Sequence, residues 1–146
     1  MTKIIKHRIL LAEDNPDDAL LTTMALEESP ACHEIIHVVD GTLVLDYLFA
    51  RGEYADRDTS ELPGIIILYL NMPKMNGLEA LKEIRANELT KRIPVVILTT
   101  STHDEDIVQS YDLGANSYVR KPVDFDEFGE LAKQLGLYWL VMNQSV

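Results

Sequence analysis

Two adjacent carboxylates, Glu13 and Asp14, follow the apolar run at residues 8–12 and are the sharpest chemical feature of the chain. Such an oxygen-rich pair suits a hard divalent cation such as Mg²⁺. A solvated loop that starts a helix uses the same residue types, so the pair alone supports both interpretations equally. The pair stands where a phosphate site would need a glycine-rich nest of backbone N–H groups. It therefore argues against a nucleotide or flavin site.

Polar side chains also follow the other apolar runs. Tyr69 and Asn71 come after residues 65–68, and Thr99 comes after residues 94–98. Lys121 follows residues 117–119 and offers a mobile positive charge that suits a phosphoryl group. Taken alone, Thr99 is an ordinary strand residue and Lys121 an ordinary surface cation. A functional role for Thr99 and Lys121 is favoured if their strands are neighbours, because the carboxyl ends of parallel strands share one edge of a sheet.

The apolar runs that must position these side chains alternate with segments of helical period. Strands are expected at residues 8–12, 34–39, 65–68, 94–98 and 117–119. The wholly apolar runs 65–68 and 94–98 are typical of a parallel sheet that helices cover on both faces. Five strand–helix units in alternation predict an α/β fold: a flavodoxin-like, doubly wound, five-stranded parallel sheet in a three-layer sandwich.

Local signals mark where the helices begin. Asn15 is a predicted cap, Pro16 occupies the first helical position, and two acids follow. The remaining segments are a polar loop at residues 52–64, a capping box at residues 102–105, and a last helix from Asp124 to about Val141. The apolar positions at helical spacing are Leu20, Leu21, Met24 and Ala25 in the first helix, then Leu43, Val44, Tyr47 and Leu48, then Leu78, Leu81 and Ile84.

Composition narrows the class of protein. The chain has 146 residues, of which 13 are Lys or Arg and 24 are Asp or Glu, so its net charge is −11. Such a charge repels phosphate backbones, and we expect no nucleic-acid partner. The single cysteine, the lack of a secretory signal and the lack of an apolar run of about 20 residues predict a cytoplasmic protein with no membrane segment. One domain over residues 1–146 is expected, with no output domain and with residues 136–146 extending the last helix.

Four segments together resemble the receiver domain of two-component response regulators (CheY-like). They are Leu10–Asp18, Leu70–Gly77, Pro94–Thr100 and Gly114–Pro122, and the resemblance runs in register from about Lys6 to the last helix. Residues 51–54, 98–101 and 138–140 look more narrowly like the stand-alone regulators that partner bacterial phytochrome kinases.

The resemblance implies a role for each matching residue. Glu13 and Asp14 would be the acidic pair that holds Mg²⁺, and Asn71 would lend its backbone carbonyl to the ion. Thr99 and Lys121 would bind the phosphoryl oxygens. In the same way, Tyr118 would be the aromatic switch residue that turns inward on activation.

Residue 69, the phosphate-accepting position of the family, departs from the family pattern. The residue two places before Asn71 is usually the aspartate that takes phosphate from a kinase histidine, and here it is Tyr69. A tyrosine hydroxyl has a pKa of about 10, so near neutral pH it is neither an anion nor a strong metal ligand. We therefore expect phosphorylation to be lost and Mg²⁺ binding to be weakened. Asp and Tyr codons differ by one base, so a point change in a competent receiver is the alternative.

The leading hypothesis is a non-enzymatic receiver in a phosphorelay that acts by protein–protein interaction. Its partner would be a sensor histidine kinase, such as one of phytochrome type, or a downstream target, and no organic cofactor is expected. The alternatives are a phosphorylation-competent receiver and a small-molecule binder on a flavodoxin-like sheet, against which the Glu13–Asp14 loop argues. A homodimer is also expected, because residues 138–142 are apolar and aromatic and would be left exposed in a monomer.

Overall fold

The core of the molecule is a five-stranded, all-parallel sheet. The computed structural model describes residues 7–28, 32–99, 109, 111–120, 130 and 134. Its strands are β1 (His7–Ala12), β2 (Cys32–Val38), β3 (Ile65–Tyr69), β4 (Val95–Thr99) and β5 (Ser117–Arg120). They are arranged in the order β2-β1-β3-β4-β5, with every neighbouring pair parallel. This order confirms the predicted flavodoxin-like α/β fold.

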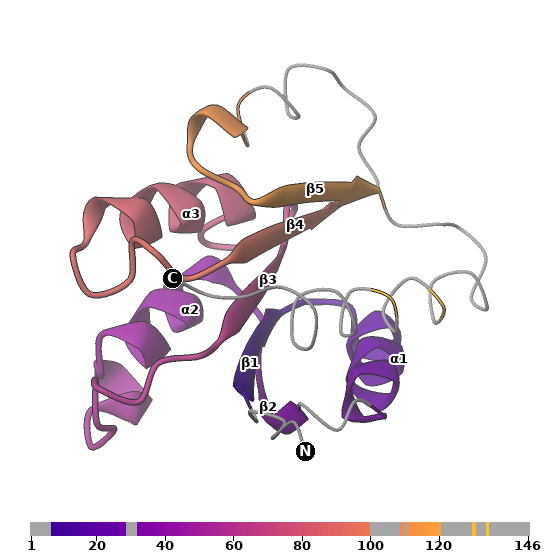
Figure 1. The fold of residues 1–146 in the computed structure, drawn as a ribbon, viewed down its shortest axis with the longest axis horizontal. Coiled ribbons are helices and arrows are strands. Elements are labelled where there is room, and N and C mark those ends of the chain that lie inside the picture. Colours follow the sequence, from indigo (N-terminus) through magenta and orange to yellow (C-terminus); the bar gives the residue numbers. More distant parts are fainter. Residues whose placement is uncertain are drawn as a thin grey trace, which may run out of the picture.

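Helices cover both faces of the sheet, as Figure 1 shows. Helices α2 (Gly41–Leu48) and α3 (Gly77–Ala86) pack on one face, over Leu10, Ile66 and Ile97. Helix α1 (Pro16–Glu27) contributes Leu26 to the other cluster, with Ile9 and Ile67. Alternate residues of each strand therefore enter opposite cores, which explains why β3 and β4 are apolar without interruption.

Helix α1 begins as predicted, but two of its four expected apolar residues stay exposed. Asn15 Oδ1 accepts hydrogen bonds from the backbone N–H groups of Asp17 and Asp18 at 3.0 and 3.1 Å. The expectation that Leu20 and Met24 belong to the apolar packing face is wrong, since they are 61% and 59% exposed. Ala25 is buried and Leu21 packs partly buried against the core, as expected, and the helix also buries Ala19, Thr22 and Leu26. Thr22 tolerates burial because its hydroxyl donates to the Asp18 carbonyl at 2.7 Å.

The segment at residues 52–64 is more ordered than the predicted polar loop. It contains a short 3₁₀ helix, η1 (Gly52–Tyr54), and it is tied to α2 by Arg57. The Arg57 guanidinium donates to the carbonyls of Tyr47 at 2.6 Å and Leu48 at 3.0 Å, and it lies 4.3 Å from the centre of the Tyr47 ring. A cation thus caps the carboxyl end of α2, where the helix dipole is negative.

Arg85 joins α3 to the β4–β5 side of the sheet. Its guanidinium donates to the carbonyls of Ile93 and Gly114, both at 2.8 Å, and to Asn116 Oδ1 at 2.8 Å. Asn116 Oδ1 also accepts from the backbone N–H of Val95 at 2.8 Å. Burial lowers the pKa of Arg85. In the described part of the chain, no helix is long and apolar enough to cross a membrane.

Candidate functional site

The carboxyl ends of the strands bring most of the predicted site residues to one edge of the sheet. Ala12 of β1 pairs with Leu68 of β3, and Tyr69 of β3 pairs with Leu98 of β4. The residues that follow β1 and those that end β3 and β4 therefore lie side by side. In open α/β sheets this edge is where ligands bind.

The two acids after β1 differ in environment. Glu13 is only 2% exposed, whereas Asp14 is exposed to solvent. The backbone N–H of Glu13 donates to the Val38 carbonyl at 3.0 Å, and the Glu13 carbonyl lies 2.7 Å from His37 Nε2. Contacts to β2 therefore hold the main chain at the start of this acidic loop. Sequence reasoning did not single out His37, which gives no local signal.

Tyr69 is the last residue of β3 and is half-buried against the core under α2 and α3. The loop after it folds back tightly, because the Gly77 N–H donates to the Leu70 carbonyl at 2.9 Å. A Cβ at Gly77 would lie 2.7 Å from the Tyr69 carbonyl oxygen and 3.2 Å from the Leu70 Cα. Only glycine fits there. Because residue 77 has no side chain, the amino end of α3 lies directly against the backbone of Tyr69 and Leu70.

A further acid at this edge was missed in the sequence. Asp40 follows β2, is 3% exposed and caps α2, accepting from the Leu43 N–H at 3.0 Å. Burial alone would raise the pKa of Asp40, but hydrogen bonds from Thr42 and Leu43 and the charge of Lys74 outweigh burial and lower the pKa. The signal for Asp40 is its position just after β2, because polar residues that follow strand ends lie at the ligand-binding edge of a parallel sheet.

The loops that follow β2 and β3 are joined. Gly41 N–H donates to the Met75 carbonyl at 2.9 Å, and a Cβ at Gly41 would lie 2.8 Å from Met75 Cγ. Lys74 has a φ of 64°, an uncommon conformation for a residue with a side chain. The exposed Asn71 belongs to the same β3–α3 loop, so its main chain is anchored from both sides.

The other side of the edge carries Thr99 and Tyr118. Thr99 ends β4 and is fully buried, with 0% exposure. Tyr118 lies in β5 opposite Ile97 and packs partly buried against the same core cluster as Tyr69. Its backbone N–H donates to the hydroxyl of Tyr111 at 3.2 Å. Lys121, which directly follows β5, and residues 136–146 lie outside the described residues.

The described donors fit a tightly held divalent cation poorly. Glu13 and Asp14 are two carboxylates that follow β1, whereas the residue that ends β3 is Tyr69, whose side chain is a phenol and not a third carboxylate. Among the described residues, no three His, Cys, Asp or Glu side chains are grouped so that they could hold a metal ion. Asp40 does not complete the set, because its carboxylate serves the α2 cap and Lys74.

Comparison with known proteins identifies close relatives. The family model described as "Response regulator receiver domain" matches residues 9–133. Response regulator Rcp1 of Synechocystis sp. is 39% identical over 132 residues, which cover 90% of this chain and 88% of Rcp1.

Two solved structures match nearly the whole chain. One is the phosphorylated cyanobacterial phytochrome response regulator RcpA, with a TM-score of 0.89 and 38% identity over 96% of this chain and 98% of that one. The other is the Mn²⁺-bound form of response regulator Rcp1, with a TM-score of 0.89 and 36% identity over 96% and 99% of the two chains.

Proposed function

Since this chain belongs to the response regulator receiver domain family and is related to phytochrome response regulators, we propose that it signals through protein–protein contacts without taking a phosphoryl group at position 69. The family match confirms the resemblance seen in the sequence. The proposed loss of phosphorylation depends on Tyr69.

Tyr69 is the observation that carries the proposal. It ends β3 between β1 and β4, in the position where the family pattern has its phosphate-accepting aspartate. A tyrosine hydroxyl is not a carboxylate, and a phosphotyrosine lacks the labile acyl-phosphate bond of a phosphoaspartate. The ring is also much larger than a carboxylate, and it packs half-buried against the core cluster under α2 and α3.

We assign the remaining residues the roles that their family positions imply. Thr99 and Lys121 are the phosphoryl-binding pair, Tyr118 is the switch residue, and Glu13 and Asp14 with the Asn71 carbonyl form a weakened Mg²⁺ site. With Tyr69 in the acceptor position these groups have no covalent step to perform. The chain accordingly acts as an interaction module and not as an enzyme.

The partner we propose is a sensor histidine kinase of phytochrome type. The relatives with matching structures are phytochrome response regulators, which supports this choice of kinase. Leu20 and Met24 give a surface for it: they are four residues apart on α1, 61% and 59% exposed, and they lie on the helix that starts beside Glu13 and Asp14. Large exposed apolar side chains of this kind mark protein interfaces.

The test is incubation with acetyl phosphate and Mg²⁺, followed by intact-protein mass spectrometry. We expect no mass increase of one phosphoryl group in the natural chain or in Tyr69→Phe, and a hydroxylamine-labile adduct in Tyr69→Asp. A stoichiometric labile adduct on the natural chain would disprove the proposal. An inert Tyr69→Asp would show that the pocket has diverged at more than one residue.

The second candidate function is an ordinary phosphorylation-competent receiver in which Tyr69 is a point change from Asp. Glu13, Asp14 and Thr99 are all present at the same edge, which favours this reading. Sequencing position 69 in the genome separates the two, since an Asp codon there makes the competent receiver the natural protein.

A further inference from the structure

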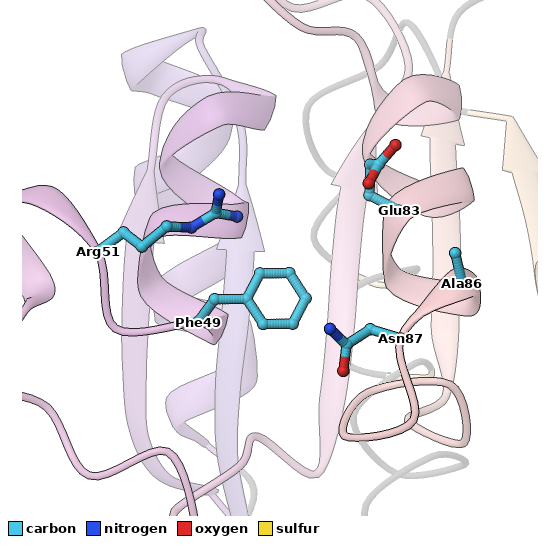
Figure 2. Close-up of a pocket in the computed structure, with 5 residues that line it drawn as sticks. All are labelled: Phe49, Arg51, Glu83, Ala86 and Asn87. Carbon is cyan, nitrogen blue, oxygen red and sulfur yellow. The ribbon is translucent and has the colours of Figure 1, made fainter.

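A pocket of about 460 Å³ lies between the carboxyl ends of α2 and α3. Figure 2 shows its five lining residues: Phe49 and Arg51 on the α2 side, and Glu83, Ala86 and Asn87 on the α3 side. Phe49 and Asn87 are the C-cap residues of the two helices. Both helices begin after the carboxyl ends of strands and run back, so the pocket lies at the opposite edge of the sheet from the site described above.

The α2 wall of the pocket is positively charged. The carbonyls at the end of α2 already receive the Arg57 guanidinium, which offsets the negative end of the helix dipole. Arg51 adds an exposed guanidinium whose Cζ lies 5.2 Å from the centre of the Phe49 ring. The backbone holds Arg51 firmly: its N–H donates to the Asp46 carbonyl at 2.8 Å, and its neighbours Ala50 and Gly52 have φ values of 52° and 57°.

The α3 wall is negatively charged. Glu83 projects from the last turn of α3, and the basic residue of that turn, Arg85, directs its guanidinium to Gly114 and Asn116 instead. The negative end of the α3 dipole adds to the charge of Glu83. The Asn87 side chain is oriented by its Oδ1, which accepts from the Leu89 N–H at 2.9 Å, and its amide nitrogen therefore remains available to a ligand.

These opposite charges do not neutralise one another within the protein. Of the ion pairs that join described residues, none includes Arg51 or Glu83. The half-buried Phe49 ring extends between the two walls in Figure 2 and supplies an apolar surface. The pocket is an open depression, so a ligand would meet one aromatic surface and charged groups that remain in contact with solvent.

We propose that this pocket binds a small zwitterionic amino acid with an apolar portion. The carboxylate pairs with Arg51 and the Asn87 amide, the ammonium pairs with Glu83, and the apolar portion lies against Phe49. A purely anionic ligand would meet Glu83, and a purely cationic ligand would meet Arg51. Only a ligand with both charges is complementary to both walls.

The test compares four six-carbon compounds by ¹⁵N–¹H chemical-shift titration of the full chain. Norleucine and 6-aminohexanoate are zwitterions with the ammonium at different positions, while hexanoate and hexylamine carry one charge each. We expect at least one zwitterion to bind about tenfold more tightly than both single-charge compounds, with the largest shifts at residues 49–51 and 83–87. The proposal is overturned if neither zwitterion exceeds them, or if the shifts lie elsewhere.

Three variants test the assignment of each charge. Arg51→Gln and Glu83→Gln should each weaken binding of the preferred zwitterion about fivefold, the effect of removing one partly exposed charge pair. Glu27→Gln, on α1, removes one negative charge from the opposite face of the molecule and should leave binding unchanged. Weakening in Glu27→Gln equal to that in Glu83→Gln would mean that overall charge, and not this pocket, governs the binding.

Discussion

Lys74 Nζ lies 4.0 Å from Oδ2 of Asp40, so that an exposed lysine after β3 pairs with a buried carboxylate after β2. The same two loops share the hydrogen bond from Gly41 N–H to the Met75 carbonyl. Asp40 also caps α2. One buried acid therefore supports both a helix start and the loop that follows Tyr69.

Replacing Asp40 with Asn should destabilise the fold by about 1 kcal/mol near pH 7, because Asn still caps the helix but loses the charge-assisted hydrogen bonds. The pKa of Asp40 is lowered in the folded state. Its stabilisation is therefore complete above the unfolded-state pKa of about 4 and is lost as the pH falls through the folded-state pKa.

Urea denaturation of the Asp40→Asn variant and the parent chain at neutral pH and below about pH 4 measures this difference. The matched control is Asp56→Asn, which removes an exposed carboxylate from the 52–64 loop and should change stability little. A stability difference for Asp40→Asn that is the same at both pH values would contradict the assignment.

The α1 surface should govern kinase docking. Leu20→Ser combined with Met24→Ser removes two exposed apolar side chains, and we expect affinity for the histidine-phosphotransfer domain of a phytochrome-type kinase to fall at least tenfold. The control is Leu89→Ser, which removes a 40% exposed leucine from the segment between α3 and β4. If the control weakens binding and the α1 variant does not, the proposed docking surface is wrong.

Mg²⁺ should bind weakly to the natural chain and at least tenfold more tightly to Tyr69→Asp, because the substitution supplies the missing carboxylate. Isothermal titration calorimetry of both proteins measures the two affinities. In the Tyr69→Asp background, Asp14→Asn should reverse the gain. Equal affinity in the natural chain and in Tyr69→Asp would show that position 69 does not contribute to metal binding.

The chain should form a homodimer in which residues 138–142 take part. Light scattering at micromolar concentration should give the mass of a dimer for the full chain and of a monomer for a version that ends at Leu137. A monomeric full chain would refute the dimer. A truncated chain that still dimerises would place the interface elsewhere.

The strand and helix pattern could be predicted because it depends on local periodicity. Ile65–Leu68 and Val95–Leu98 are buried as their apolar runs indicate, and Asn15 caps α1 as its position before Pro16 indicates. The exposure of Leu20 and Met24 could not be predicted, because residues 19–26 contain apolar side chains on more than one side of the helix. The sheet, and not hydrophobicity alone, selects Leu26 for burial and leaves Leu20 exposed.

By itself the sequence determined the fold class and the family, because both follow from residue type and short-range spacing. The tertiary structure alone decided that Asp40 pairs with Lys74, that Arg85 reaches Gly114 and Asn116, and that Arg51 and Glu83 face one pocket. These pairs are separated by about 30 residues along the chain. Only the packing of strands and helices brings such groups together, and their charges and hydrogen bonds act over a few ångströms.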